Sequence, residues 1–290
     1  MRTNWSRDDR YAMKTDTLEV FHNYTDQAVF TEFHAHDFYE VLFFLSGQVD
    51  YAVENRLYAL RPGSVVLTDS SELHRTVIGQ GGNYERYVLW LRPDCVRRLE
   101  AASGTPLSGC FDASARSHCN LLRPNAALFR SMLQRLESLL APAEDAEARV
   151  LRGCALTELL VFLNQAQRGT VLVPGLHVVS DPKIDELIFY VNQHLAESLP
   201  LDDLAEHFYI SKYHLSRLFK ACMGMPLHQY ILNKRLLYAK SLLAAGAGAG
   251  DACMGSGFNN YAHFSRAFKT FFGYSPSLWN REHNSGDPLI

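Results

Sequence analysis

Four polar side chains in the N-terminal part of the chain have the types and spacing of a metal or ligand site: His34, His36, Glu40 and, further along, His74. Residues two apart on a strand face the same side, and Glu40 lies an even number of residues from both neighbouring histidines. Three imidazoles and a carboxylate suit zinc, iron or manganese, and open coordination positions would support oxygen or isomerase chemistry. The pattern predicts that all of them point into one interior.

The same residues have two other interpretations. They can pack and hydrogen-bond within the interior, or they can line a pocket for an organic effector, where nearby aromatic rings would stack on a sugar-like or aromatic ligand. We favour the effector pocket over a metal site, and we predict no catalytic residue and no obligatory cofactor. The candidate ligand-binding residues are His34, His36, Phe38, Glu40, Tyr51, His74 and Trp90, and the candidate metal ligands are His34, His36, Glu40 and His74.

A second group of residues forms a repeat near the C-terminus. The pattern Ser-Arg-x-Phe-Lys occurs at 216–220 and again at 265–269, and each copy is followed four residues later by a glycine, Gly224 or Gly273. Two short helices that each end at a glycine, each behind another short helix, suggest two helix-turn-helix modules. Such a layout fits the reading of two successive turns of duplex DNA.

The repeat also indicates which side chains would face DNA. Ser211 stands where the first repeated helix needs an N-cap, and Asn259 or Asn260 stands there in the second. Side chains on the N-terminal turns of such helices reach base edges in the major groove. The candidate DNA-binding residues are Ser211, Lys212, Tyr213, His214, Ser216, Arg217, Lys220, Asn259, Asn260, Tyr261, His263, Arg266 and Lys269.

Identity between the two copies separates two roles. Arg217 and Arg266 are the same in both copies, which suits a shared contact with the DNA backbone. Tyr213 in the first copy corresponds to Ala262 in the second, and this difference suits sequence readout. The arginines and lysines have the alternative of intramolecular salt bridges, and the whole repeat has the alternative of a plain helical bundle.

These residues carry a resemblance. The region 183–281 resembles the DNA-binding domain of the AraC/XylS family of bacterial transcription regulators, and 28–91, with its H-x-H-x(3)-E-x(6)-G spacing, resembles the cupin-type sensor domain that commonly precedes it. The resemblance implies two helix-turn-helix units joined by a long helix, and activation beside RNA polymerase. The matching residues include Leu204-Ala205, Leu215 to Lys220, Gly224, Arg235-Leu236, Gly257-Phe258, Phe264 to Arg266, Phe268-Lys269, Gly273 and Ser275-Pro276.

One segment departs from the family pattern. The helix before the second turn should be apolar, yet the chain has Gly246, Gly248 and Gly250 alternating with alanine. A glycine inside a helix costs about 1 kcal/mol relative to alanine. We therefore expect a looser second module.

The elements that must position these residues follow from the hydrophobic pattern. Short runs of β-branched and aromatic residues broken by turn formers predict a barrel or two-sheet sandwich, followed by two helices and a linker. We expect an α+β chain with two domains: a cupin-like β-barrel with a helical dimerisation segment over 1–168, a linker over 169–180, and an all-α domain with two helix-turn-helix motifs over 181–290. The expected strands are 28–33, 39–46, 49–54, 56–60, 65–68 and 84–91, and the expected middle helices are 126–140 and 146–167.

The middle helices carry Leu and Phe at three-to-four spacing. An exposed apolar stripe needs a partner, so we expect these helices to pair two subunits into a homodimer. The alternative is that the stripe packs on its own barrel.

Composition restricts the class of protein. The 290 residues are 47% hydrophobic and 20% charged with a net charge of -3, so bulk charge gives no sign of nucleic-acid binding. No run approaches the roughly 18 apolar residues of a membrane span. The N-terminus has no apolar stretch and the six cysteines form no C-x-x-C pair, which predicts reduced thiols in a cytoplasmic protein.

We therefore expect a DNA-binding regulator, an activator rather than an enzyme, whose partners are double-stranded DNA, RNA polymerase and a small-molecule effector, with a sugar as the candidate effector. The alternative is a metal-dependent cupin enzyme with a degenerate DNA-binding domain.

Overall fold

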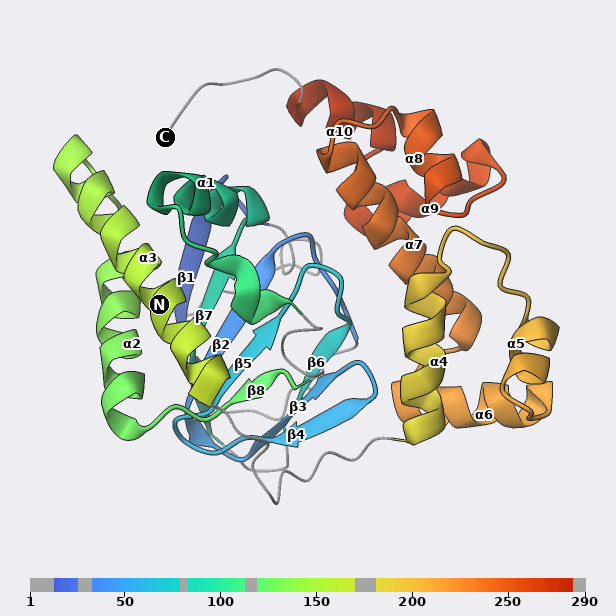
Figure 1. Cartoon of the computed structure of the whole chain (residues 1–290), viewed down its shortest axis with the longest axis horizontal. Coiled ribbons are helices and arrows are strands. Elements are labelled where there is room, and N and C mark those ends of the chain that lie inside the picture. The colour runs from blue at the N-terminus through green and yellow to red at the C-terminus, as the bar shows by residue number, and fades with distance from the viewer. Residues whose placement is uncertain (1–12, 26–32, 79–82, 113–118, 170–180, 284–290) are drawn as a thin grey trace. The chain divides into compact units, whose positions relative to one another are not determined.

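A computed structural model describes residues 13–25, 33–78, 83–112, 119–169 and 181–283. The chain divides into two compact units, and the described strands all belong to the N-terminal one (Figure 1). The predicted linker, apart from Gly169, and most of the predicted strand at 28–33 lie outside the described residues. None of the described helices combines the length and the apolar character that crossing a membrane requires.

The strands of the N-terminal unit pair as two antiparallel sheets. The larger sheet has the order β1-β7-β2-β5-β8 and the smaller has the order β4-β3-β6. The strands predicted at 39–46, 49–54, 56–60, 65–68 and 84–91 are present, while β1, β6 and β8 were not predicted. The strands are β1 (Leu18–Thr25), β2 (Tyr39–Gly47), β3 (Val49–Val53), β4 (Arg56–Ala59), β5 (Val65–Thr68), β6 (His74–Ile78), β7 (Tyr84–Leu91) and β8 (Leu121–Leu122).

Strand β2 lies at the centre of the larger sheet and contributes to two separate cores. Val41 and Phe43 belong to the core on the helical side, whereas Leu42 and Phe44 belong to the core shared with the smaller sheet. Alternation along a strand puts Glu40 on the same side as Leu42. The strand thus carries a carboxylate into the apolar space between the sheets.

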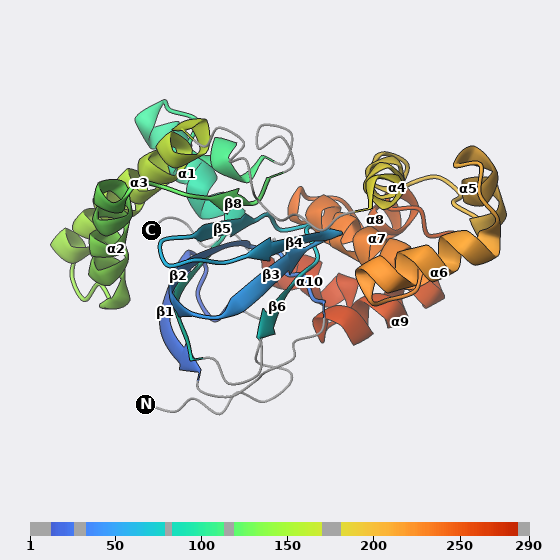
Figure 2. The same ribbon diagram turned by 90° about the horizontal axis from the view of Figure 1, so that it is seen from below.

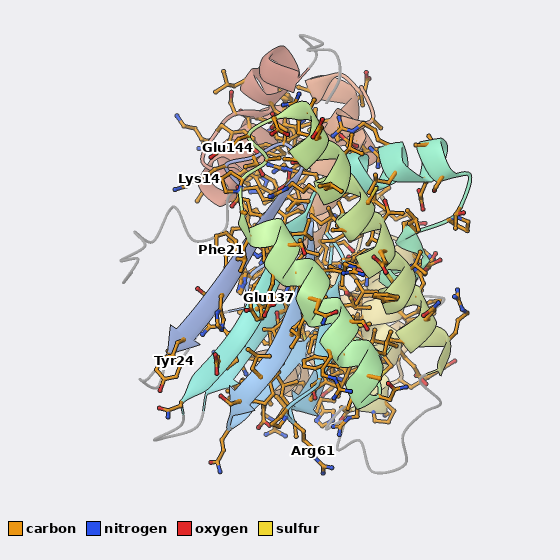
Figure 3. All side chains as sticks on the ribbon, turned by 90° about the vertical axis from the view of Figure 1, so that its left-hand side faces the viewer. Lys14, Phe21, Tyr24, Arg61, Glu137 and Glu144 are labelled. Carbon is orange, nitrogen blue, oxygen red and sulfur yellow. The ribbon has the colours of Figure 1, made fainter. Side chains whose placement is uncertain are left out.

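Helices cover the other face of the larger sheet (Figures 2 and 3). Leu136, Leu159 and Leu163 are buried in the core that contains the strand residues, so the stripe expected to need a partner is covered by the chain's own sheet. The expectation that this stripe needs a second subunit is therefore wrong; Val150 and Leu151 remain exposed. The elements are α1 (Pro93–Ser103), which was not predicted, the 3-10 helix η2 (Ser108–Phe111), α2 (Ala126–Leu140) and α3 (Ala146–Gly169).

The C-terminal unit contains helices throughout its described residues. The Asp181 side chain caps the first of them by accepting from the backbone N–H groups of Lys183 and Ile184. Gly224 and Gly273 end two helices in the left-handed conformation, with φ of 68° and 85°, which explains the repeated glycine. The helices are α4 (Pro182–Gln193), α5 (Leu201–His207), α6 (Lys212–Met223), α7 (Leu227–Ala244), α8 (Ala249–Gly255), α9 (Tyr261–Phe272) and α10 (Pro276–His283).

The glycine-rich segment before the second turn is less costly than the sequence suggests. Gly246 has φ of 93°, in a turn where glycine is favoured, and Gly248 is the N-cap of α8. Of the three glycines, only Gly250 lies inside the helix, so the expected penalty for the other two is wrong. Ala252 and Cys253 are buried in the second module's core, and small side chains suffice there.

Candidate functional sites

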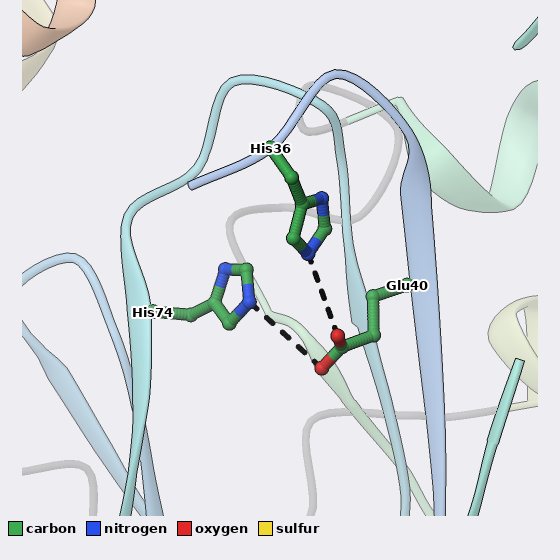
Figure 4. A group of neighbouring side chains, drawn as sticks. All are labelled: His36, Glu40 and His74. Atoms are coloured by element: carbon green, nitrogen blue, oxygen red, sulfur yellow. Dashed lines mark ion pairs between the residues drawn. The ribbon is translucent and has the colours of Figure 1, made fainter. Parts of the chain in front are cut away.

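Three side chains of the predicted N-terminal site meet between the two sheets (Figure 4). His36 Nε2 lies 3.4 Å from Glu40 Oε2, and His74 Nε2 lies 3.8 Å from Glu40 Oε1. The side-chain ligand atoms of the three residues lie within 4.8 Å of one another. His36, Glu40 and His74 are 3%, 8% and 1% exposed, so the cluster is excluded from bulk solvent. The predicted convergence of these residues is confirmed.

Glu40 is held by one side chain from each sheet. Tyr51 on β3 donates its hydroxyl to Oε1 at 2.8 Å, and Trp90 on β7 donates its indole N–H to Oε2 at 2.8 Å. Burial alone would raise the pKa of Glu40, but the neighbouring imidazoles of His36, His74 and His34 outweigh it and hold the pKa well below its usual range. The group is therefore a carboxylate at physiological pH.

The imidazoles are oriented by backbone carbonyls. His36 Nδ1 lies 2.8 Å from the carbonyl oxygen of Phe38, and His74 Nδ1 lies 2.9 Å from that of Glu72. A carbonyl only accepts, so each Nδ1 carries the proton and each Nε2 faces Glu40. Burial lowers the pKa of His74 to about 4, against the attraction of Glu40, so this ring is neutral at physiological pH.

His34 joins the cluster through the backbone. It exchanges two backbone hydrogen bonds with His74, at 3.1 and 2.9 Å, and the two ring centroids lie 4.4 Å apart. No regular strand contains His34 or His36, so the alternation argument reached the right grouping although β2 begins only at Tyr39.

The predicted aromatic residues complete the same cluster. Phe38 stacks on His36 with ring centroids 3.7 Å apart and also contacts Trp90, at 4.8 Å. Tyr51 lies parallel to His74, at 6.0 Å. The structure thus brings together all seven candidate ligand-binding residues, with some rings stacked and others packed edge to face. Their binding of an effector stays a prediction.

In the first helix-turn-helix module, the predicted N-cap is confirmed. Ser211 Oγ accepts from the backbone N–H of His214 at 3.3 Å, which starts α6 at Lys212. Lys212 also forms an exposed ion pair with Asp202 of α5, at 3.1 Å, which the sequence did not reveal. The other outward candidates, Tyr213, His214, Arg217 and Lys220, are exposed, and Ser216 is half-buried.

In the second module the cap is Asn260 rather than Asn259. Asn260 Oδ1 accepts from the backbone N–H of His263 at 2.9 Å, and Asn259 lies exposed in the turn before it. This turn is one residue longer than the first, because α8 and α9 are separated by 256–260 whereas α5 and α6 are separated by 208–211. The candidates on α9, namely Tyr261, His263, Arg266 and Lys269, are exposed.

Comparison with known proteins assigns a family to each of the two units. Residues 17–160 match the family described as AraC-like ligand binding domain, and residues 204–282 match the family described as helix-turn-helix domain. The chain belongs to the AraC family. This AraC-family protein is a DNA-binding transcription regulator with an effector-binding domain, and its fold is the expected α+β arrangement of two domains.

Curated relatives of this AraC-family chain are regulators too. The transcriptional activator RhaS of Escherichia fergusonii is 27% identical over 251 residues, which cover 86% of this chain and 87% of RhaS. The regulator YfiF of Bacillus subtilis is 26% identical over 257 residues, covering 86% of this chain and 78% of YfiF. The transcriptional activator AarP of Providencia stuartii is 35% identical over 108 residues, covering 37% of this chain and 80% of AarP.

One unusual residue of the AraC-family DNA-binding unit was not predicted from the sequence. Tyr209, in the first turn, has φ of 54° and is 94% exposed. At the matching place in the second turn stands Gly257, with φ of 86°, where an added Cβ would lie 2.3 Å from the carbonyl oxygen of Leu195. Comparing the two turns reveals the signal: a bulky residue occupies a conformation that the other copy gives to glycine.

Proposed function

We propose that this protein activates transcription by inserting α6 and α9 into two successive major-groove segments, under the control of a small molecule bound in the N-terminal unit. The observation that carries this proposal is that two separately capped helices expose equivalent cations. Arg217 and Lys220 on α6 correspond to Arg266 and Lys269 on α9, and all four are exposed.

The helix N-termini supply part of the DNA contact. Free backbone N–H groups and the helix dipole favour an anion there, so phosphates approach the first turns of α6 and α9. Within this arrangement Arg217 and Arg266 contact the backbone, while Tyr213, 81% exposed near the start of α6, reads bases.

Hydroxyl-radical footprinting on the DNA upstream of the chain's own gene tests this proposal. Two protected segments about one helical turn, or roughly 10 base pairs, apart are expected. Arg217→Ala should weaken protection of one segment first, and Arg266→Ala the other. Arg130→Ala, which removes an exposed cation from α2, is the matched control and should leave both segments protected.

If both arginine variants erased protection evenly over one short segment, the two-helix proposal would be wrong. A single module would then make the contacts, and the second would serve the fold.

We infer that the effector binds at the cluster around Glu40. A carboxylate with imidazoles and stacked aromatic rings is the lining that sugars meet in proteins, and Trp90 donates directly to Glu40 at 2.8 Å. A sugar that displaces this hydrogen bond should change the tryptophan fluorescence, and the change should saturate as the sugar concentration rises. The Trp90→Phe variant should lose that signal, and the Trp5→Phe variant should keep it.

The remaining partners follow from activation. An activator contacts RNA polymerase, and stimulation of purified polymerase in transcription assays would test this contact. An activator also works in the cytoplasm, where the bacterial DNA is.

We also expect a homodimer, supported by the exposed Val150 and Leu151 at the start of α3. Sedimentation of the full chain tests this, because Leu151→Glu should shift a dimer toward monomer.

A further inference from the structure

The two turns of the DNA-binding unit follow the same backbone path. In the first turn, Tyr209 donates its backbone N–H to the carbonyl of Glu206 at 3.0 Å, and in the second Gly257 donates to that of Met254 at 3.1 Å. Both residues have a positive φ, of 54° and 86°. Because a tyrosine occupies this conformation in the first turn, the conformation alone does not account for the glycine in the second.

Close packing accounts for Gly257. A Cβ added there would lie 2.3 Å from the backbone carbonyl oxygen of Leu195 and 2.9 Å from Nε of Arg235, closer than real Cβ atoms approach. Leu195 follows α4, which packs against α6, and Arg235 lies on α7. Leu195, Arg235 and Gly257 therefore form a junction at which three separate segments meet, and the second helix-turn-helix module touches the loop that follows α4.

Arg235 holds the junction together. Its Nε donates to the carbonyl oxygen of Leu195 at 2.9 Å, and its Nη2 donates to that of Glu197 at 2.5 Å. A guanidinium is planar and presents its donors as a fixed fork, so two acceptors on one loop fix the direction of the side chain. The arginine thus ties the loop after α4 to the middle of α7.

Arg235 lies between the cores of the two modules. Tyr230, earlier on α7, packs on Phe219 of α6 with ring centroids 5.3 Å apart, whereas Leu236 is buried in the core formed with α8 and α9. A single long helix that joins two cores fixes their separation, but long helices bend, which leaves the relative direction of the cores adjustable. A lateral contact at the middle of the helix removes that freedom.

We propose that Arg235 and Gly257 are positioning residues that set the direction of α9 relative to α6, and with it the number of base pairs between the two DNA segments. They act through the two helices that contact DNA. The inference rests on the proposed function, in which both helices enter the major groove. The spacing of the operator then depends on the junction and not on the side chains that read bases.

Operators with altered spacing test this role. One base pair is inserted between the two protected segments, and the full-length protein is titrated against the original and the altered DNA. The insertion moves the second segment by about 3.4 Å and turns it by roughly 34°. Rigidly held modules cannot then engage both segments, so the wild type should lose at least ~10-fold in affinity. Unchanged wild-type affinity after the insertion would overturn the proposal.

Variants of Arg235 separate the fork from the charge. Arg235→Gln removes the fork and should bind the original operator about 10-fold more weakly, while the inserted base pair should cost this variant less than ~3-fold. Arg235→Lys keeps the charge without the fork and should behave in the same way. If Arg235→Lys has the spacing preference of the wild type, the charge is what matters and the proposal is wrong. An unchanged preference in Arg235→Gln would also refute it.

Glycine variants test the same junction from the other side. Gly257→Ala places a Cβ against Leu195 and should reduce the spacing preference too. Gly273→Ala is the matched control, because Gly273 has a φ of 85° and an added Cβ meets nothing within 4 Å. That variant should keep the wild-type preference, and equal effects of the two changes would contradict the role of the junction. If Arg235→Gln does not fold, the wild type and these two variants still decide.

A measurement without DNA separates the junction from the proposed function. Spin-labelled keto amino acids replace Tyr213 on α6 and Lys269 on α9, both exposed, and double electron–electron resonance gives the distribution of distances between them. The distribution should be narrow in the wild type and broad in Arg235→Gln. Equal widths would refute the junction alone. Broadening in a protein that binds no specific DNA would refute the proposed regulator alone.

Discussion

Salt dependence of DNA binding gives a quantitative test of the assigned backbone contacts. Four exposed cations, two on α6 and two on α9, are assigned to phosphates, whereas Lys212 is compensated by Asp202 at 3.1 Å. Each phosphate contact contributes about 0.9 to the slope of log affinity against log salt, so the wild type should have a slope of roughly −3.6. Arg217→Ala should reduce it to roughly −2.7.

These slopes translate into measurable affinities. Between 50 and 200 mM salt, the wild type should lose roughly 150-fold in affinity and the variant roughly 40-fold. The ratio of the two affinities therefore shrinks about 3.5-fold over that range. The Arg217→Ala, Arg266→Ala double variant should have a slope of roughly −1.8.

Fluorescence anisotropy with a labelled operator at several salt concentrations measures these slopes. Arg130→Ala, on α2, is the control and should run parallel to the wild type. If the line for Arg217→Ala is also parallel but displaced, and its base preference changes, Arg217 reads bases and its assignment to the DNA backbone is wrong.

Two further pairs of variants test the structure of the DNA-binding unit. Asp202→Asn should release Lys212 for phosphate, steepening the salt slope by about 0.9, while Asp203→Asn, in the same helical turn, should not; equal slopes would contradict the ion pair's role. Gly257→Ala combines a left-handed φ with a backbone clash and should destabilise by about 3 kcal/mol in urea unfolding, whereas Gly273→Ala meets nothing within 4 Å and should cost about 1 kcal/mol; similar costs would show that the clash relaxes.

Local pattern was enough for the elements with strong periodicity. The strand at 65–68 and the helix at 126–140 have the predicted bounds, because apolar runs and repeats specify their type directly. Strand β1 was missed because it has polar residues on its exposed side and lies at the edge of the described sheet, beside β7. β8 was missed because two residues carry no period.

The candidate site shows the same division between local and long-range information. Alternation grouped His36 with Glu40 correctly. The placement of His74 depends on its pairing with Val53 in the smaller sheet. The hydrogen bond from Trp90 to Glu40 depends on the register that sets these two residues opposite each other. Cross-strand register is a property of the whole sheet, which one strand's sequence does not express.

Competition binding tests the central claim, that this chain is a sequence-specific regulator. The full-length protein is titrated against labelled DNA from upstream of its own gene at near-physiological salt, with scrambled DNA as competitor. We predict binding at least ~10³-fold tighter than to the scramble. Equal affinity for both, with and without candidate effectors and metal ions, would contradict it.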